Sequence, residues 1–146
     1  MKKLLFMLVL MISTFSFAQS RVSTILAQGT APKWEISQVV TNKTDTIVYF
    51  YMGYQNQRYQ HITDIGSIII GSKADAESFI AALRELAEAP DGSDYNINVY
   101  KFKLSKYNFS KNIYISDKSD KFTTITKKQA LSLASALESN LHHFLR

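Results

Sequence analysis

His61 and Asp64 are the residues of this sequence that come nearest to an acid–base pair. An imidazole oriented by a carboxylate can act as a general base, so this pair is the candidate site of a small hydrolase or lyase. A spacing of three residues places the two side chains on opposite faces of a continuous strand, unless the chain bends by Thr63. A surface histidine beside a turn-forming aspartate explains the same residues without catalysis. We therefore expect a non-enzymatic protein, with the hydrolase or lyase as the alternative.

A second group is aromatic and lies in residues 46–59. Tyr49 and Tyr51 share one face of a predicted strand, and Arg58 and Tyr59 follow at its end. Outward tyrosines on a sheet can stack on sugars or on the side chains of a partner. The alternative is core packing, because a central strand needs apolar and aromatic residues on both faces. We predict these four residues as part of a binding surface.

A third group consists of lysines in residues 98–128, a stretch that holds eight lysines and two aspartates. Lys101, Lys103 and Lys106 are interleaved with aromatic residues, a pattern that suits an anionic polymer because lysine supplies charge and the rings supply stacking. The alternative is the solvated side of a half-buried strand, on which lysines discourage edge-to-edge pairing. The sequence predicts these three lysines as binding residues.

Other chemistry is excluded by residue type and motif. The chain has no cysteine, which rules out a disulfide, a thiol nucleophile and a thiolate metal site. It contains no phosphate-binding loop, dinucleotide fingerprint, H-E-x-x-H or EF-hand pattern, and no G-x-S-x-G elbow. His142 and His143 are adjacent and point about 100° apart on a helix, so they do not form a metal-binding pair. We expect no cofactor and no metal.

The N-terminus, MKKLLFMLVLMISTFSFA, has two lysines, an apolar stretch over residues 4–17 and small residues at Ser16 and Ala18. This segment, with Gln19, resembles bacterial Sec signal peptides of the Gram-negative type. The resemblance implies cleavage after residue 18 and export to the periplasm or the medium. Fourteen residues rise about 21 Å as a helix, less than the roughly 30 Å of a hydrocarbon core, so we expect no transmembrane anchor after cleavage. Cleavage removes two lysines and lowers the formal charge from +5 to +3.

Export narrows the expected partners. Genomic nucleic acid is not expected, which leaves an acidic glycan, a lipopolysaccharide headgroup or an envelope protein. The leading hypothesis is an exported binding protein that uses an exposed sheet face with tyrosines and lysines. A third alternative is a structural or inhibitory component of a cell-envelope assembly, in which an exposed strand adds to the sheet of a partner.

The elements that must position these residues follow from periodicity. Residues 19–32 read as a flexible lead-in, because small and polar residues interrupt a short apolar patch. Period-two patterns predict strands, and apolar spacings of three and four predict two helices, capped by Ser72 and by the capping box Thr126-x-x-Gln129. A change of apolar parity near Val99 predicts a bulge in a long strand. The predicted strands are 33–41, 46–54, 58–62, 67–70, 95–106, 112–115 and 121–125.

These elements predict a single α+β domain over residues 33–146. Its mainly antiparallel sheet of six or seven strands has two amphipathic helices on one face. Residues 62–64 match residues 115–117 at a spacing of 53, and the two helices match at a spacing of 54, which indicates a duplicated βββα unit. Chance similarity between two alanine- and leucine-rich helices is the alternative.

Overall fold

The computed structural model describes residues 21–30, 32–41, 45–58, 64–90, 94–99, 102–107 and 110–144. These residues form eight strands, two α-helices and a short 3-10 helix, whose bounds follow in chain order. They are β1 (Arg21–Thr30), β2 (Lys33–Thr41), β3 (Asp45–Gln55), β4 (Ile65–Ile70), α2 (Lys73–Glu88), β5 (Tyr95–Val99), β6 (Phe102–Lys106), β7 (Ile113–Asp117), β8 (Phe122–Ile125), α3 (Lys127–Ser139) and η1 (Leu141–His143). The segment predicted as a signal peptide lies outside the described residues.

The strands form two sheets, and the prediction of a single sheet of six or seven strands is wrong. One sheet has the order β1-β2-β3-β4 and the other β5-β6-β7-β8, with every neighbouring pair antiparallel. Each sheet is a meander of chain neighbours followed by a helix, so each half has four strands, one more than the predicted βββα unit. Periodicity finds strands, but it does not determine which edges pair. Here α2 separates β4 from β5, and β5 begins a second sheet.

Two local differences add strands to the predicted set. Of the predicted strand 58–62, the structure describes only Arg58, which lies in a turn, and residues 59–62 lie outside the described residues. The sequence predicts residues 19–32 as a flexible lead-in segment without a strand. In the structure, Arg21–Thr30 forms β1 and pairs with β2 along its length, with one irregularity between Ile25 and Ala27. Residues 95–106 read as one bulged strand, whereas they form the antiparallel pair β5 and β6. The apolar parity changes there because the chain reverses direction between Val99 and Phe102, which face each other across the pair.

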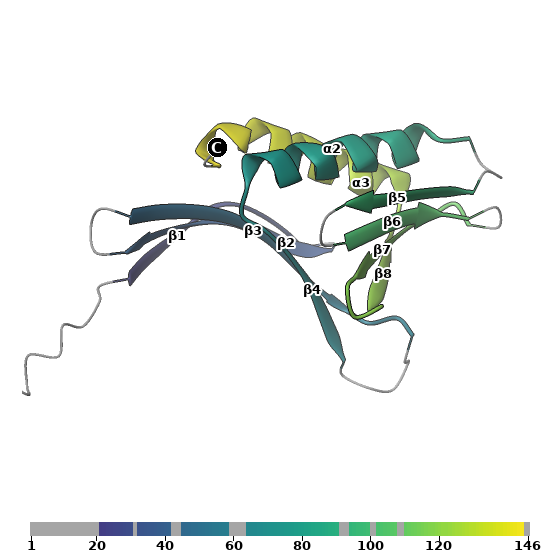
Figure 1. Cartoon of the computed structure of the whole chain (residues 1–146), viewed down its shortest axis with the longest axis horizontal. Helices are drawn as coiled ribbons and strands as arrows, with labels where there is room; N and C mark the ends of the chain where they lie inside the picture. The colour runs from purple at the N-terminus through teal and green to yellow at the C-terminus, as the bar shows by residue number, and fades with distance from the viewer. Residues whose placement is uncertain are drawn as a thin grey trace, which may run out of the picture.

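Both predicted helices are confirmed, together with their caps. The Ser72 Oγ accepts a hydrogen bond from the Asp75 N–H at 3.1 Å, and the Thr126 and Gln129 side chains form a reciprocal capping box. The two helices pack together, and Figure 1 shows both on the same side of the strands. No described helix is long and apolar enough to cross a membrane.

One hydrophobic core joins both sheets and both helices. Phe79 of α2 lies at its centre, with its ring 5.9 Å from that of Phe50 in the first sheet and 4.9 Å from that of Phe102 in the second. Trp34 extends the aromatic row beyond Phe50, at 6.3 Å between centroids. Because α2 contacts both sheets through Phe79, the two halves share their apolar burial.

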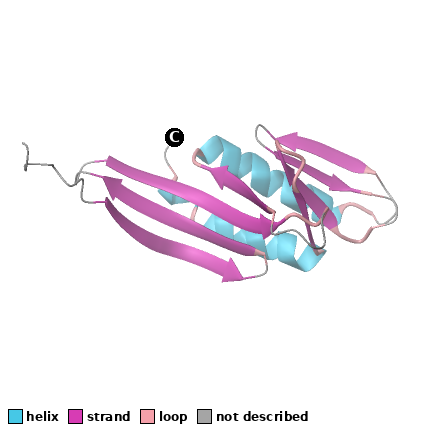
Figure 2. Ribbon diagram, turned by 90° about the horizontal axis from the view of Figure 1, so that it is seen from below, coloured by secondary structure: helices cyan, strands magenta, loops and turns pink. Residues whose placement is uncertain are grey.

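The faces of the two sheets that point away from the helices are called here the outer faces. Figure 2 shows the long strands of the first sheet in front, with the helices behind them. The outer face of the first sheet presents four isoleucines that are more than half exposed, namely Ile25, Ile47, Ile65 and Ile69. Ile69 lies between the core residues Ile68 and Ile70, and Ile47 precedes the core residue Val48, so strand alternation separates the buried face from the open one.

Candidate binding site

The two halves of the chain meet where the β3–β4 turn lies against β8. The Gln57 N–H donates to the Phe122 carbonyl at 3.0 Å, and the Thr124 hydroxyl donates to the Gln57 side-chain oxygen at 3.0 Å. The Tyr54 hydroxyl donates to the Lys121 carbonyl, also at 3.0 Å. These bonds hold the end of β3 on the second sheet, which brings the turn residues over that sheet.

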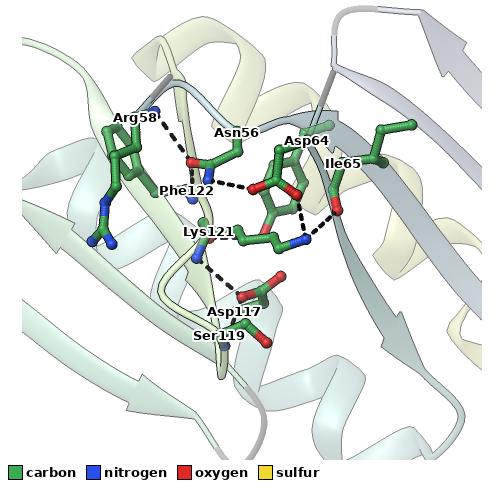
Figure 3. Close-up of polar contacts among 9 residues, drawn as sticks. Asn56, Arg58, Asp64, Ile65, Asp117, Ser119, Lys121 and Phe122 are labelled. Carbon is green, nitrogen blue, oxygen red and sulfur yellow. Dashed lines mark hydrogen bonds and ion pairs between the residues drawn. The ribbon is translucent and has the colours of Figure 1, made fainter. Parts of the chain in front are cut away.

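Asn56 is the central residue of this junction and is only 2% exposed. Its side-chain oxygen accepts from the backbone N–H of Arg58 at 3.2 Å and from that of Phe122 at 3.3 Å. Its amide donates to the Asp64 carboxylate at 2.9 Å, as Figure 3 shows. A buried amide with these partners fixes the turn, because any shift would leave a polar group unpaired. Asn56 therefore determines where Arg58 lies.

Asp64 closes the same network with an ion pair. Its other oxygen lies 2.5 Å from the Lys121 ammonium, which also donates to the Ile65 carbonyl at 3.0 Å. The hydrogen bond from Asn56, followed by that from Lys121, holds the pKa of the Asp64 carboxyl below its ordinary value. Asp64 is thus a charged structural group in this junction, and His61, its proposed catalytic partner, lies outside the described residues.

Tyr54 has a perturbed hydroxyl at the same junction. Burial raises its pKa well above the ordinary value, and the negative charge of Asp117 raises it further. The Asp117 carboxylate in turn accepts from the backbone N–H groups of Ser119 and Lys121, which shapes the β7–β8 turn. Tyr54 remains a neutral hydrogen-bond donor at physiological pH.

A hollow of about 290 Å³ lies on the outer face of the second sheet, beside this junction. Its aromatic floor comes from three neighbouring positions: the Tyr107 ring packs edge-on against Tyr114 at 5.2 Å, and Phe122 lies 5.9 Å beyond. Tyr107 is 46% exposed, so part of this floor is open. The remaining lining is polar or charged, from Arg58, Lys103, Ser105, Ser116 and Asp120.

Two cations reach this hollow from different halves of the chain. Arg58 comes from the β3–β4 turn, and Lys103 comes from the outward side of β6, between the core residues Phe102 and Leu104. Figure 3 shows the Arg58 guanidinium pointing away from the Asn56 network. Within the described ranges, no carboxylate forms a salt bridge with either cation. Both charges therefore face a concave aromatic surface.

The other predicted binding residues lie elsewhere. Tyr49 and Tyr51 are half-buried on the outer face of the first sheet, because Val48, Phe50 and Met52 take the core side of β3. The structure thus separates the tyrosines from Lys103, which the sequence placed on one surface. Tyr59 and Lys101 lie outside the described residues.

Lys106 is also separated from Lys103, although both lie on β6. Its side chain is on the core side of the strand and only 4% exposed, and its ammonium donates to the Ala89 carbonyl at 2.6 Å. Ala89 is the C-cap residue of α2, so this lysine places a positive charge at the negative end of the helix dipole. Its position gives it a structural role.

Sequence reasoning missed the aromatic floor. Tyr114 alternates with the core residues Ile113 and Ile115, and Phe122 is the outward residue that starts β8. Outward aromatic residues on adjacent strands are the pattern that could have revealed the floor. Asn56 had no such pattern, because its burial depends on contacts with a strand 66 residues away.

The described residues contain no group of three histidine, aspartate or glutamate side chains that could hold a metal ion. Comparisons with protein-family models, with curated proteins and with solved structures give no match for this chain.

Proposed function

We propose that this protein is an exported, non-enzymatic binding protein that recognises an anionic sugar at the hollow on the second sheet. The observation that carries the proposal is the convergence of Arg58 and Lys103 on the floor formed by Tyr107, Tyr114 and Phe122. Cations without a carboxylate partner in the described structure favour a negatively charged ligand, and aromatic rings favour one with a flat apolar face.

A sugar that carries a carboxylate or a phosphate satisfies each part of this surface. Its carbon-bound hydrogens can pack on the rings, as other apolar groups do. Its acidic group can take charge-assisted hydrogen bonds from the Arg58 guanidinium and the Lys103 ammonium. Its hydroxyls can donate to the hydroxyl oxygens of Ser105 and Ser116, which line the same hollow and donate their own protons to Asn96 and to the Lys103 carbonyl. An acidic glycan and a lipopolysaccharide headgroup both contain this chemistry.

The test is the affinity of the purified protein for digalacturonate, measured by calorimetry against neutral digalactose. Each lost charge-assisted hydrogen bond should weaken binding roughly tenfold or more, so we expect this loss for Arg58→Ala and for Lys103→Ala. Added salt should weaken the binding of digalacturonate, because both cations are near the surface.

Lys128→Ala is the matched control, since this lysine is exposed at the start of α3 and lines none of the hollows described here. Its affinity for digalacturonate should equal that of the unmodified protein. Equal binding of the acidic and neutral sugars, or equal affinity in all three variants, would overturn the proposal.

A further inference from the structure

The hollow that holds Arg58 is one of three that adjoin one another around the β7–β8 turn. A second hollow, of about 210 Å³, shares Lys103, Ser116 and Asp120 with it. A third, of about 470 Å³, shares Phe102, Asp117 and Lys118 with the second. Because consecutive hollows have lining residues in common, they adjoin one another, and this row of three hollows is called here the groove.

The groove joins the outer face of one sheet to that of the other. It begins on the second sheet at Arg58 and Tyr114, and it continues past the paired ends of β6 and β7, where Phe102 lies opposite Asp117. It ends against β4, where Ser67 and Ile69 line the third hollow together with Ser119 from the β7–β8 turn. Ser67 and Ile69 are exposed residues on the outward side of β4.

We infer that the groove binds an acidic oligosaccharide of several units, with one end at Arg58 and Lys103 and the other at β4. This inference rests on the proposed function and specifies its ligand. The first hollow, at about 290 Å³, lies at the small end of the roughly 300–1,000 Å³ typical of sites for small ligands. A longer chain can use the two hollows that follow.

The side chains along the groove favour a sugar polymer over other polyanions. Asp120 lines the first two hollows and adopts a left-handed backbone conformation, with φ of 56°. Asp117 lines the second and third hollows. Carboxylates accept hydrogen bonds from hydroxyl groups, which a sugar supplies at every unit. The groove therefore suits a ligand in which hydroxyls outnumber acidic groups.

The experiment compares digalacturonate with hexagalacturonate on the purified protein, by calorimetry. The hexamer should bind roughly tenfold or more tightly than the dimer, because its additional units contact the second and third hollows. A tryptophan in Ser67→Trp should block the third hollow and remove most of this gain, while the affinity for the dimer stays unchanged. Ser132→Trp is the matched control, since Ser132 is exposed on α3 and lines none of the three hollows.

The outcomes separate this inference from the proposed function. If the dimer and the hexamer bind with equal affinity, or Ser67→Trp leaves the hexamer unaffected, the extended ligand is wrong and the binding of a single unit stands. If neither sugar binds, both proposals fail. Arg58→Ala should weaken the dimer and the hexamer alike, because every binding mode uses the first hollow.

Discussion

Lys103 and Lys106 show how two similar residues on one short strand acquire different roles. Alternation along β6 directs Lys103 to the outer face and Lys106 to the core side. Lys103 therefore presents its charge to the hollow, whereas Lys106 donates to the carbonyl of Ala89, the C-cap residue of α2. Both were predicted as binding residues, since composition does not distinguish a lysine that faces solvent from one that caps a helix.

Replacement of Lys106 by methionine should destabilise the protein and leave the hollow intact. Methionine keeps the apolar stem but removes a buried hydrogen bond from a charged group, which typically contributes about 1.5–3 kcal/mol. We expect the free energy of unfolding in urea to fall by that amount. Lys103→Met is the control, and it should change stability by less than about 0.5 kcal/mol while weakening digalacturonate binding. Equal stability of the two variants would contradict the structural role of Lys106.

Asp64 makes the junction between the halves sensitive to acid. Its pKa is lowered in the folded protein, so the unfolded chain binds a proton more readily and folding stability depends on its charge. The contribution is complete above the ordinary pKa of 3.8 and is lost as the pH falls through the lower pKa of the folded state. The stability difference between the unmodified protein and Asp64→Asn should therefore be constant near neutral pH and shrink below about pH 4. Urea titrations between pH 2.5 and pH 7 would measure it, and a difference that persists at the lowest pH would contradict this explanation.

At the scale of elements, the sequence predicted those helices and strands whose ends are marked by capping or turn residues nearby in the chain. Both helices were predictable because their caps lie within three residues of the first turn. The β5–β6 pair was missed because Tyr100 and Lys101, between the strands, are not turn-forming residues such as glycine, asparagine or proline. β1 was missed because small and polar residues weaken its alternation. A hairpin with no turn signature has the same local pattern as a bulged strand.

Gly66 illustrates a requirement set between two strands. It faces Tyr54 across the β3–β4 pair, and a Cβ atom added there would lie 2.3 Å from a carbon of the Tyr54 ring. Gly66→Ala must displace the Tyr54 ring, whose hydroxyl donates a hydrogen bond to the Lys121 carbonyl. We expect a loss of about 1–3 kcal/mol in the free energy of unfolding.

Gly71→Ala is the matched control for this substitution, because an added Cβ atom there meets nothing within 4 Å. It should be neutral or stabilise the protein by up to about 1 kcal/mol, since alanine restricts the unfolded chain. Urea unfolding measures both variants. Equal changes in the free energy of unfolding for the two substitutions would show that the close packing of Tyr54 on Gly66 does not stabilise the protein.

At the scale of the molecule, the two halves are joined by a shared core and by a hollow that both of them line. The hollow needs Arg58 from the first half and its aromatic floor from the second. No local pattern predicts this arrangement, since it depends on Asn56 meeting Phe122 and on Tyr54 meeting Lys121. Arg58 and Lys103 were predicted as binding residues because charged side chains at strand ends and on outward strand positions face solvent, and the structure brings both to one hollow. Their convergence required the structure.

Replacement of Phe79 tests whether the two halves of the chain share one core. Its ring contacts Phe50 of the first sheet and Phe102 of the second, and it is fully buried. Phe79→Ala should lower the free energy of unfolding by about 3–5 kcal/mol, because it leaves a cavity where both sheets meet α2.

Trp34, the single tryptophan, reports on the first sheet by fluorescence, while far-ultraviolet circular dichroism reports on the whole chain. Since one core serves both halves, the two probes should give one coincident urea transition in the unmodified protein. Separate transitions would show that each half folds alone, and the site between them would then not depend on a shared core.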